Sequence, residues 1–344
     1  MKILILTTSG FAPTHTDKLL SQIEYLNSFS DIYAVVEKDC ELADIEHLIM
    51  TQNFDCVYPS TVFEFSEDKK SILSFNKVLF QILEYHKQAY IGSEIFVHML
   101  LNDKALTNLR SGMSLPSLLL TKVFWYKRNA DALKYIDKAP FPVIVKPNTL
   151  AASLGISKKS IAYTRDNLIE IIERQFNTFS NLNEVLLEHY LEDAQEFTVS
   201  VTGNGRKRLC SATAMIPKKE KYEIYSYTNK NLKEQDRTLK YSSDIPLSVK
   251  RILKERAVYL SELLCTRDYS RFDFLMDTNN NIYLIDANSL PSLGTNYLME
   301  YINKQLVSPE QIFSLILLVF CKRMGIPYPK CKNNIPDKIL ELIF

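Results

Sequence analysis

The sequence predicts an α/β protein built from more than one domain. At 344 residues the chain is longer than most domains with a single hydrophobic core, which favours two or three domains. Residues 1–92 alternate between short apolar strands and amphipathic segments, as in a parallel sheet with crossover helices. Near the C-terminus, the turn sequence Asp277–Asn281 separates two apolar segments and predicts a β-hairpin.

In the N-terminal region, residues 1–92, the first two strands are separated by a segment in which Leu19, Ile23 and Leu26 have helical spacing. The turn after the first strand, Thr8–Phe11, lacks the Gly-x-Gly-x-x-Gly fingerprint, so a dinucleotide site is disfavoured there. The strands expected in this region are Ile3–Thr7, Ile32–Val36, Cys56–Tyr58 and Tyr90–Ile91.

The rest of the chain mixes helices with longer strands. Ser93 and Glu94 have the character of a cap and a first-turn acid for a helix over Ile95–Leu101. The sequence Ser308-Pro309-Glu310-Gln311 predicts a capping box, and the helix that it starts is expected to end at Gly325. Further expectations are a strand over Val143–Val145, a polar insertion from Pro217 to Pro246 and a helix over Leu247–Leu264.

Composition argues against several classes of function. The formal net charge is +1 at pH 7, so no basic field indicates nucleic-acid binding. The six cysteines form no Cys-x-x-Cys pair and the five histidines no metal-ligand spacing, which disfavours zinc and iron–sulfur sites and fits a reducing cytosol. The longest apolar stretch, Ile312–Phe320, is too short to cross a bilayer. We therefore expect a cytoplasmic protein without nucleic-acid or membrane partners.

Polar residues inside the predicted hairpin indicate a metal site. Asp273 lies in the first apolar strand, and Asp286 and Asn288 lie in the second. Residues two apart share one face of a strand, so Asp286 and Asn288 are expected to point the same way, toward Asp273. Two carboxylates and an amide oxygen are hard ligands that suit Mg²⁺, which completes its coordination with water and phosphate.

Four further charged residues stand at the ends of predicted elements. Lys104 begins a helix, Lys146 ends the strand Val143–Val145, Glu188 ends another strand and Glu196 opens the next. A lysine at a strand end is a point charge suited to phosphate oxygens. The small side chains between Ala151 and Gly155 would let backbone N–H groups approach a phosphate. Taken singly, each of these charges is also compatible with an ordinary solvated surface residue.

In this order and spacing, the motifs resemble the ATP-grasp superfamily and, within it, the D-alanine–D-alanine ligases. The resemblance spans roughly residues 85 to 320. It implies a Rossmann-like substrate domain at residues 1–92, a central ATP-grasp lid subdomain at 93–185 and an ATP-grasp catalytic domain at 186–344. The matching segments are Gly92-Ser93, Asn102–Lys104, Val143–Pro147, Glu184–Glu188, Glu196–Val199, Arg271–Asp273, Asp286–Asn288 and Leu290-Pro291.

The resemblance also implies an ATP-dependent carboxylate–amine ligase that works through an acyl phosphate, with a small-molecule carboxylate and amine as substrates, as a homodimer. Mg²⁺, with Mn²⁺ as an alternative, would be bound by Asp273, Asp286 and Asn288. Arg271 would face the charge that develops during the reaction. By the same resemblance, the ATP phosphates would be contacted by Lys104, Lys146, Ser153 and Lys230. The adenine would be bound by Glu188, His189, Tyr190 and Leu191, and the ribose by Glu196. The N–H of Ser292 would face the oxyanion.

Departures from the family pattern fall on the substrate side. The turn Thr8–His15 lacks the carboxylate that receives the first substrate's ammonium group, and the nearest acid is Asp17. Ala152, Asn231 and Tyr297 replace three hydroxyl-bearing residues of the substrate network, where Tyr297 stands for a carboxylate-binding serine. Because a buried ammonium without its partner is costly, we expect a substrate pair other than D-Ala with D-Ala.

Two alternatives to a ligase are left open by the sequence. One is an ATP-grasp kinase, or an enzyme that passes its acyl phosphate to an acceptor other than an amine. The other is a non-catalytic nucleotide-binding protein, against which the retention of Lys146, Arg271, Asp273 and Asn288 argues.

Overall fold

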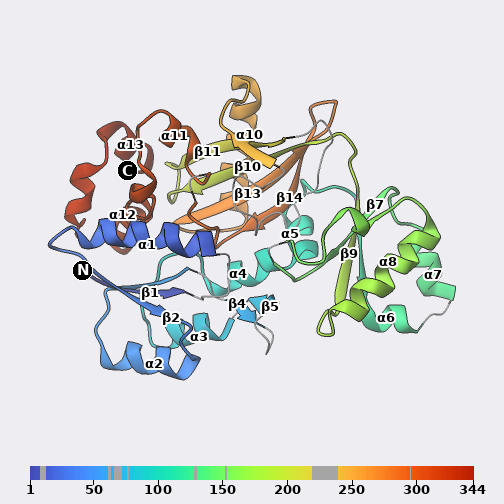
Figure 1. The fold of residues 1–344 in the computed structure, drawn as a ribbon, viewed down its shortest axis with the longest axis horizontal. Coiled ribbons are helices and arrows are strands. Elements are labelled where there is room, and N and C mark those ends of the chain that lie inside the picture. The colour runs from blue at the N-terminus through green and yellow to red at the C-terminus, as the bar shows by residue number, and fades with distance from the viewer. Residues whose placement is uncertain are drawn as a thin grey trace.

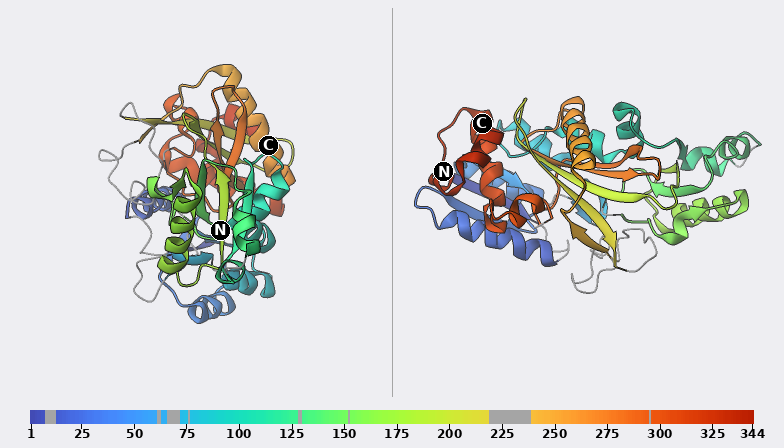
Figure 2. Two further views of the ribbon diagram at one scale, coloured as in Figure 1. Left: turned by 90° about the vertical axis from the view of Figure 1, so that its right-hand side faces the viewer. Right: turned by 90° about the horizontal axis from the view of Figure 1, so that it is seen from above.

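The structure is a computed structural model, and it describes residues 1–7, 13–60, 63–65, 72–75, 77–127, 130–151, 153–218, 239–294 and 296–344. Figure 1 shows how the described elements are arranged. The N-terminal strands and helices lie beside the C-terminal helices on the left, a large sheet occupies the middle, and a smaller sheet with its helices extends to the right. The right-hand view of Figure 2 shows the same elongated arrangement, and the left-hand view looks along it from the side of the smaller sheet.

The N-terminal region forms a parallel sheet, as predicted, and its strand order is β2-β1-β3. Leu4 and Ile5 of β1 are completely buried because helices cover the sheet, and α12 adds Phe313 and Leu317 to the same core. The predicted strand at Tyr90 is a single bridge to Val57. The elements of this part are β1 (Lys2–Thr7), α1 (Pro13–Asn27), β2 (Tyr33–Lys38), α2 (Leu42–Thr51), β3 (Cys56–Pro59), β4 (Phe63–Phe65), β5 (Ile72–Phe75) and α3 (Lys77–Tyr85).

The central part of the chain forms an antiparallel sheet with order β6-β9-β7-β8, which packs on α8 through its own hydrophobic core. The predicted domain boundary at residue 185 falls inside β9, whose pairing with β6 and β7 places the whole strand in this sheet. The elements are β6 (Ser117–Thr121), α6 (Lys122–Tyr126), α7 (Ala130–Ile136), β7 (Val143–Pro147), η1 (Lys158–Ser160), β8 (Ile161–Ala162), α8 (Arg165–Thr178) and β9 (Glu184–His189).

The large sheet has order β12-β11-β10-β13-β14 and is antiparallel throughout, and it contains the predicted hairpin as β13 and β14. Along β10, Phe197, Val199 and Val201 point toward a core that also includes residues of α4 and α10. The alternate residues therefore lie on the opposite face. The elements are α4 (Ile95–Asn102), α5 (Lys104–Ser111), β10 (Gln195–Thr202), β11 (Leu209–Pro217), β12 (Leu239–Ser242), α10 (Leu247–Leu263), β13 (Tyr269–Met276) and β14 (Ile282–Asn288).

The C-terminal helices agree with the predicted capping box. The Ser308 and Gln311 side chains cap each other's backbone, and the helix ends at Gly325, whose left-handed conformation suits glycine. Within the predicted insertion Pro217–Pro246, β12 pairs with β11, and residues 219–238 lie outside the described part. The elements are α11 (Met299–Asn303), η3 (Pro309–Gln311), α12 (Ile312–Met324), η4 (Lys330–Asn334) and α13 (Asp337–Ile343).

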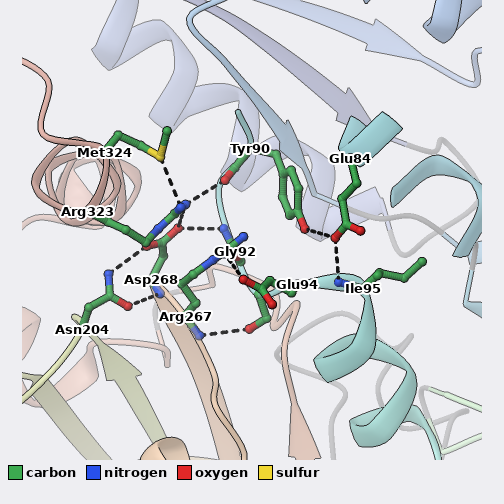
Figure 3. A network of polar contacts seen from close by, with 11 residues as sticks. Glu84, Tyr90, Gly92, Glu94, Ile95, Asn204, Arg267, Asp268, Arg323 and Met324 are labelled. Carbon is green, nitrogen blue, oxygen red and sulfur yellow. Dashed lines mark hydrogen bonds and ion pairs between the residues drawn. The ribbon is translucent and has the colours of Figure 1, made fainter. Parts of the chain in front are cut away.

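A buried polar network joins these parts of the molecule (Figure 3). Asp268 precedes β13 and has a solvent exposure of 0%. Its carboxylate accepts hydrogen bonds from the Gly92 N–H at 2.9 Å and from Asn204 Nδ2 at 2.9 Å. Arg323 of α12 donates to the same carboxylate through Nε at 2.8 Å and Nη2 at 2.7 Å. One carboxylate thus connects the end of the N-terminal region, the end of β10 and the C-terminal helix.

The neighbouring Arg267 changes the predicted role of Ser93. The Ser93 hydroxyl accepts from the Arg267 N–H at 3.0 Å, and Glu94 forms an ion pair with Arg267 Nη1 at 2.8 Å. Glu94 occupies the N-cap position of α4 without a capping hydrogen bond from its side chain. The prediction that Ser93 and Glu94 form a local cap was therefore wrong, because both side chains are taken by a residue more than 170 positions away.

Candidate active site

The hairpin brings the predicted metal ligands together on one face of the large sheet. Asp273 of β13 lies directly opposite Asp286 of β14, and Arg271 lies opposite Asn288. Residues that are paired across antiparallel strands project to the same side, so all four side chains share a face. A β-bulge follows Asp273, and bulges of this kind often redirect side chains at functional sites.

Arg271 holds Asp273 in a bidentate ion pair. Nε donates to Oδ1 at 3.0 Å and a terminal nitrogen donates to Oδ2 at 2.9 Å. The Thr198 hydroxyl of β10 donates to the same Oδ1 at 2.7 Å. Burial disfavours the charge on Arg271, but Asp273 and Asp286 outweigh this effect and raise the pKa of the guanidinium above its ordinary value. The arginine is therefore a fixed positive charge at this face of the sheet.

Lys146 and Glu188 form a buried ion pair, so the structure joins two residues that the sequence placed in one nucleotide site. Lys146 Nζ donates to Glu188 Oε1, and Asn108 Nδ2 of α5 lies 3.3 Å from Glu188 Oε2. The pair forms because β7 and β9 are neighbouring antiparallel strands. Glu188 is 1% exposed, and a charge at that depth requires such a partner.

Lys104 begins α5, as predicted, and its side chain turns toward the loop after β7. Nζ donates to the Leu150 carbonyl at 2.7 Å and to the Asn148 carbonyl at 3.3 Å. This loop carries Ser153, whose φ of 61° is left-handed. At Gly155 a Cβ atom would lie 2.7 Å from Pro147, so the close turn of the loop needs glycine.

Two backbone N–H groups in the segment after Glu188 donate hydrogen bonds to residues that precede β6 and β7. The His189 N–H donates to Pro116 O at 2.9 Å and the Tyr190 N–H donates to Pro142 O at 2.7 Å. Neither of these N–H groups is therefore available to bind a base. Leu191 packs in a small apolar cluster with Leu275, which lies on the same sheet face as Asp273 and Glu196. This cluster links the predicted adenine segment to the hairpin.

Tyr297 does not occupy an open substrate position. It is 2% exposed, and its hydroxyl donates to the Val201 carbonyl at 3.0 Å and lies 3.2 Å from the Thr202 hydroxyl. The residue packs with Tyr269 as part of the core. Its hydroxyl is therefore used in hydrogen bonds within the large sheet.

The segment after Asn288 is held by Asn288 itself and by Gln22, a residue that the sequence did not single out. Asn288 Oδ1 accepts from the Leu290 N–H at 2.9 Å, and Gln22 Nε2 of α1 donates to Leu293 O at 2.9 Å. Ser292, between them, is half-buried. Thr198 could have been found from strand alternation, because it lies two residues after Glu196. Nothing in the sequence indicated a role for Gln22, because the residue that it contacts lies 271 positions away in the chain.

Several predicted positions lie outside the described residues. They are Ala152, Lys230, Asn231 and residues 8–12 of the first turn, and the side chains of residues 13–17, Asp17 included, are likewise not described. In the described part, no group of three or more His, Cys, Asp or Glu side chains is arranged to hold a metal. The predicted set contains two carboxylates and an amide. No described helix has both the length and the apolar character needed to cross a membrane.

His98 supports the segment after Asn288 and predicts a pH dependence of stability. Its Nδ1 lies 2.6 Å from the Ser289 hydroxyl, and burial lowers its pKa from 6.5 to about 3. Between these values the unfolded chain binds the proton and the folded chain does not. The contribution of His98 is therefore complete above pH 6.5 and falls as the pH drops toward 3, by up to about 1.4 kcal/mol per pH unit.

Urea unfolding at pH 7.5 and at pH 4.5 measures this effect. The variant His98→Phe keeps a ring beside Phe80, which lies 4.4 Å away between ring centroids, and removes the titrating group. We expect the wild-type protein to lose more stability than the variant between the two pH values. Equal losses would show that His98 does not contribute to the pH dependence.

Comparison with known proteins agrees with this fold. A family model described as D-ala D-ala ligase C-terminus matches residues 113–317. D-alanine–D-alanine ligase B of Clostridium tetani is 30% identical over 179 residues, which cover 51% of this chain and 46% of that protein. The chain therefore spans about half the length of this relative.

Two solved structures resemble most of this chain. The D-alanine–D-alanine ligase from Bacillus anthracis, in a complex with ATP, matches with a TM-score of 0.68 at 17% identity and covers 94% of this chain and 99% of that one. The VanG D-Ala:D-Ser ligase from Enterococcus faecalis also has a TM-score of 0.68, at 16% identity, and covers 93% and 99%. The fold is thus the three-domain ATP-grasp fold of these ligases. Because the family model covers more than half of the chain, the protein belongs to the D-Ala–D-Ala ligase C-terminal family.

Proposed function

We propose that the protein is an ATP-dependent ligase that joins a small-molecule carboxylate to an amine through an acyl phosphate. The observation that carries this proposal is the register of the hairpin, which sets Asp273 opposite Asp286 and Arg271 opposite Asn288 on one face. Membership of the D-Ala–D-Ala ligase C-terminal family supports it. The buried pair of Lys146 and Glu188 adds a second charged element that suits a nucleotide.

The donor set of the hairpin fits Mg²⁺, with Mn²⁺ as an alternative. Asp273, Asp286 and Asn288 would hold the ion through oxygen atoms, which are the ligands it prefers. Asp273 Oδ2 accepts one hydrogen bond from Arg271, so it keeps a lone pair for a cation. When bound, the ion would supply positive charge to the phosphates. Asp286, one methylene shorter than the glutamate that the related ligases usually have, would reach the ion from its position directly opposite Asp273.

The remaining roles follow from charge and position. Lys104 and Lys146 would neutralise phosphate oxygens, and Glu188 would accept from the adenine amino group. Ser153 and Lys230 would contact the transferred phosphate. The substrate carboxylate attacks the γ-phosphorus, ADP leaves, and the amine then displaces phosphate from the acyl carbon. Arg271 and the Ser292 N–H would offset the negative charge on the oxygens in these steps, which is where phosphoryl transfer needs most help.

We propose a substrate pair other than D-Ala with D-Ala. Tyr297 supports this because its hydroxyl is committed to Val201 and Thr202 in the core. The structural neighbour from Enterococcus faecalis is a D-Ala:D-Ser ligase, so the fold accommodates more than one second substrate. A cytoplasmic homodimer is also part of the proposal, and size-exclusion chromatography with light scattering would report the dimer.

A panel of amino acids and small amines, assayed for ADP release, tests the proposal. We expect one acid–amine pair to give ADP, phosphate and an amide detected by mass spectrometry. Lys146→Ala should lower that rate about 10²- to 10³-fold, as the loss of a single charge-stabilising group does in other enzymes. A stable phosphorylated product without an amide would overturn the ligase in favour of a kinase. Efficient D-Ala-D-Ala synthesis would overturn the altered substrate pair alone.

A further inference from the structure

Asn148, two residues after Lys146, is completely buried at 0% exposure. Its carboxamide uses both of its ends. Oδ1 accepts from the Ala105 N–H of α5 at 2.9 Å. Nδ2 donates to Asp103 Oδ1 at 3.0 Å and to Glu184 Oε2 of β9 at 2.9 Å. One side chain therefore ties the end of β7 to the start of β9 and to the start of α5.

The backbone of the same segment repeats this connection. The Asn148 N–H donates to Glu184 O at 3.1 Å, and Asn148 O accepts from the Lys104 N–H at 3.2 Å. One residue further on, Thr149 O accepts from Asn102 Nδ2 at 3.1 Å. The loop after β7 is thus fixed to α5 through several consecutive residues. These contacts join elements of the large sheet's helical layer to the smaller sheet.

The start of α5 has no exposed donors left for an anion in this arrangement. The N–H groups of its first turn all donate to oxygen atoms of Asn148 and Asp103. Lys104 and Ala105 donate to Asn148 O and Oδ1, and Leu106 and Thr107 donate to Asp103 Oδ1 and O. A helix N-terminus normally leaves such groups for a cap or a ligand. The terminus is therefore used as a structural joint, and its phosphate contact would fall to the side chain of Lys104.

We propose that Asn148 is a positioning residue that sets the two phosphate lysines, Lys104 and Lys146, relative to the start of the loop after β7, residues 148–151. This inference depends on the proposed ATP-binding function. Asn148 lies two residues from Lys146 and contacts the backbone of Lys104 directly, and the Lys104 side chain donates to Asn148 O and Leu150 O. Asn148 acts through these neighbours, and no contact with the nucleotide is assigned to it.

Only a carboxamide suits the position. It must offer an acceptor to Ala105 and two donors to carboxylates at the same time. Asn148→Ala would leave the Ala105 N–H and Glu184 Oε2 without this partner, and would remove one of the two hydrogen bonds that Asp103 Oδ1 accepts. Asn148→Asp would set a third carboxylate against Asp103 and Glu184, and the repulsion would push the loop away from α5. Adding Glu184→Gln to that variant restores a donor and should recover part of the loss.

Affinity for ATP and for adenosine, measured by isothermal titration calorimetry, separates positioning from general stability. Asn148→Ala is expected to weaken ATP binding about tenfold and to leave adenosine binding unchanged, because the lysines act on the phosphates. Asn204→Ala is the matched control. Its carboxamide also makes two hydrogen bonds, both to Asp268, but it follows the end of β10 away from Glu196. We expect this control to lower stability without changing either affinity.

The outcomes of these measurements separate the positioning role of Asn148 from the proposed function. Unchanged ATP affinity in Asn148→Ala, or equal weakening of ATP and adenosine, would overturn the positioning role while leaving the ATP site intact. Failure of Glu184→Gln to recover any ATP affinity in the Asn148→Asp background would overturn it as well. If the alanine variant does not fold, Asn148→Ser is used with the same expectations. A wild-type protein that binds neither ATP nor adenosine would instead overturn the proposed function itself.

Discussion

Asp268→Ala is expected to lower the free energy of unfolding by about 3–5 kcal/mol, which is the usual cost of removing one partner from a buried ion pair. Asp268 is fully buried, and its carboxylate accepts from Arg323, Asn204 and the Gly92 N–H. Without it, the largely buried guanidinium of Arg323 keeps its charge and loses its counterion. The substitution should therefore destabilise the joint between the N-terminal region and the large sheet.

Urea unfolding at pH 7.5 measures this loss, with Arg251→Ala as the control. Arg251 and Glu255 form an ion pair at 3.5 Å on the surface of α10, where both side chains are exposed. Surface pairs of this kind contribute well under about 1 kcal/mol, so the control should be almost silent. If Asp268→Ala cost no more than Arg251→Ala, the network in Figure 3 would not stabilise the fold.

Local patterns were enough to predict the hairpin and its polar residues. Asp286 and Asn288 are two residues apart, and the turn at Asp277–Asn281 determines which two strands pair as a hairpin. The capping box at Ser308 and the parallel N-terminal sheet were predicted for the same reason, because short-range spacing determines them. The sites assigned to ATP and Mg²⁺ remain proposals, although the structure places their hairpin residues on one face.

Contacts between distant segments could not be predicted. Lys146 and Glu188 were assigned to one site from the family pattern, but nothing in the sequence says that they pair with each other. That contact depends on β7 lying beside β9. Asn148 and Asp268 are single polar residues in loops, and their partners lie up to 176 positions away. A buried polar residue shows its importance only when its partners are known, because its burial is a result of the fold.

The other large effect concerns Arg271. If the proposed ligase is correct, Arg271→Ala should lower the rate of ADP formation about 10²- to 10³-fold, since it removes a fixed positive charge from the face where the reaction would occur. Arg271→Lys should recover only part of this loss, because a lysine keeps the positive charge but cannot reproduce the two parallel hydrogen bonds to Asp273. Steady-state assays with the substrate pair found in the panel would give kcat and KM for each variant.

Thr198→Val separates two explanations of the arginine's effect. Thr198 also holds Asp273, through a hydrogen bond of 2.7 Å, and valine has nearly the same shape without the hydroxyl. If Arg271 acts only by orienting Asp273, the two substitutions should reduce kcat to a similar extent. If its charge acts on the reacting oxygens, Thr198→Val should cost about tenfold or less, and Arg271→Ala should cost far more. Equal losses would therefore reduce Arg271 from a catalytic residue to a support for the metal ligand.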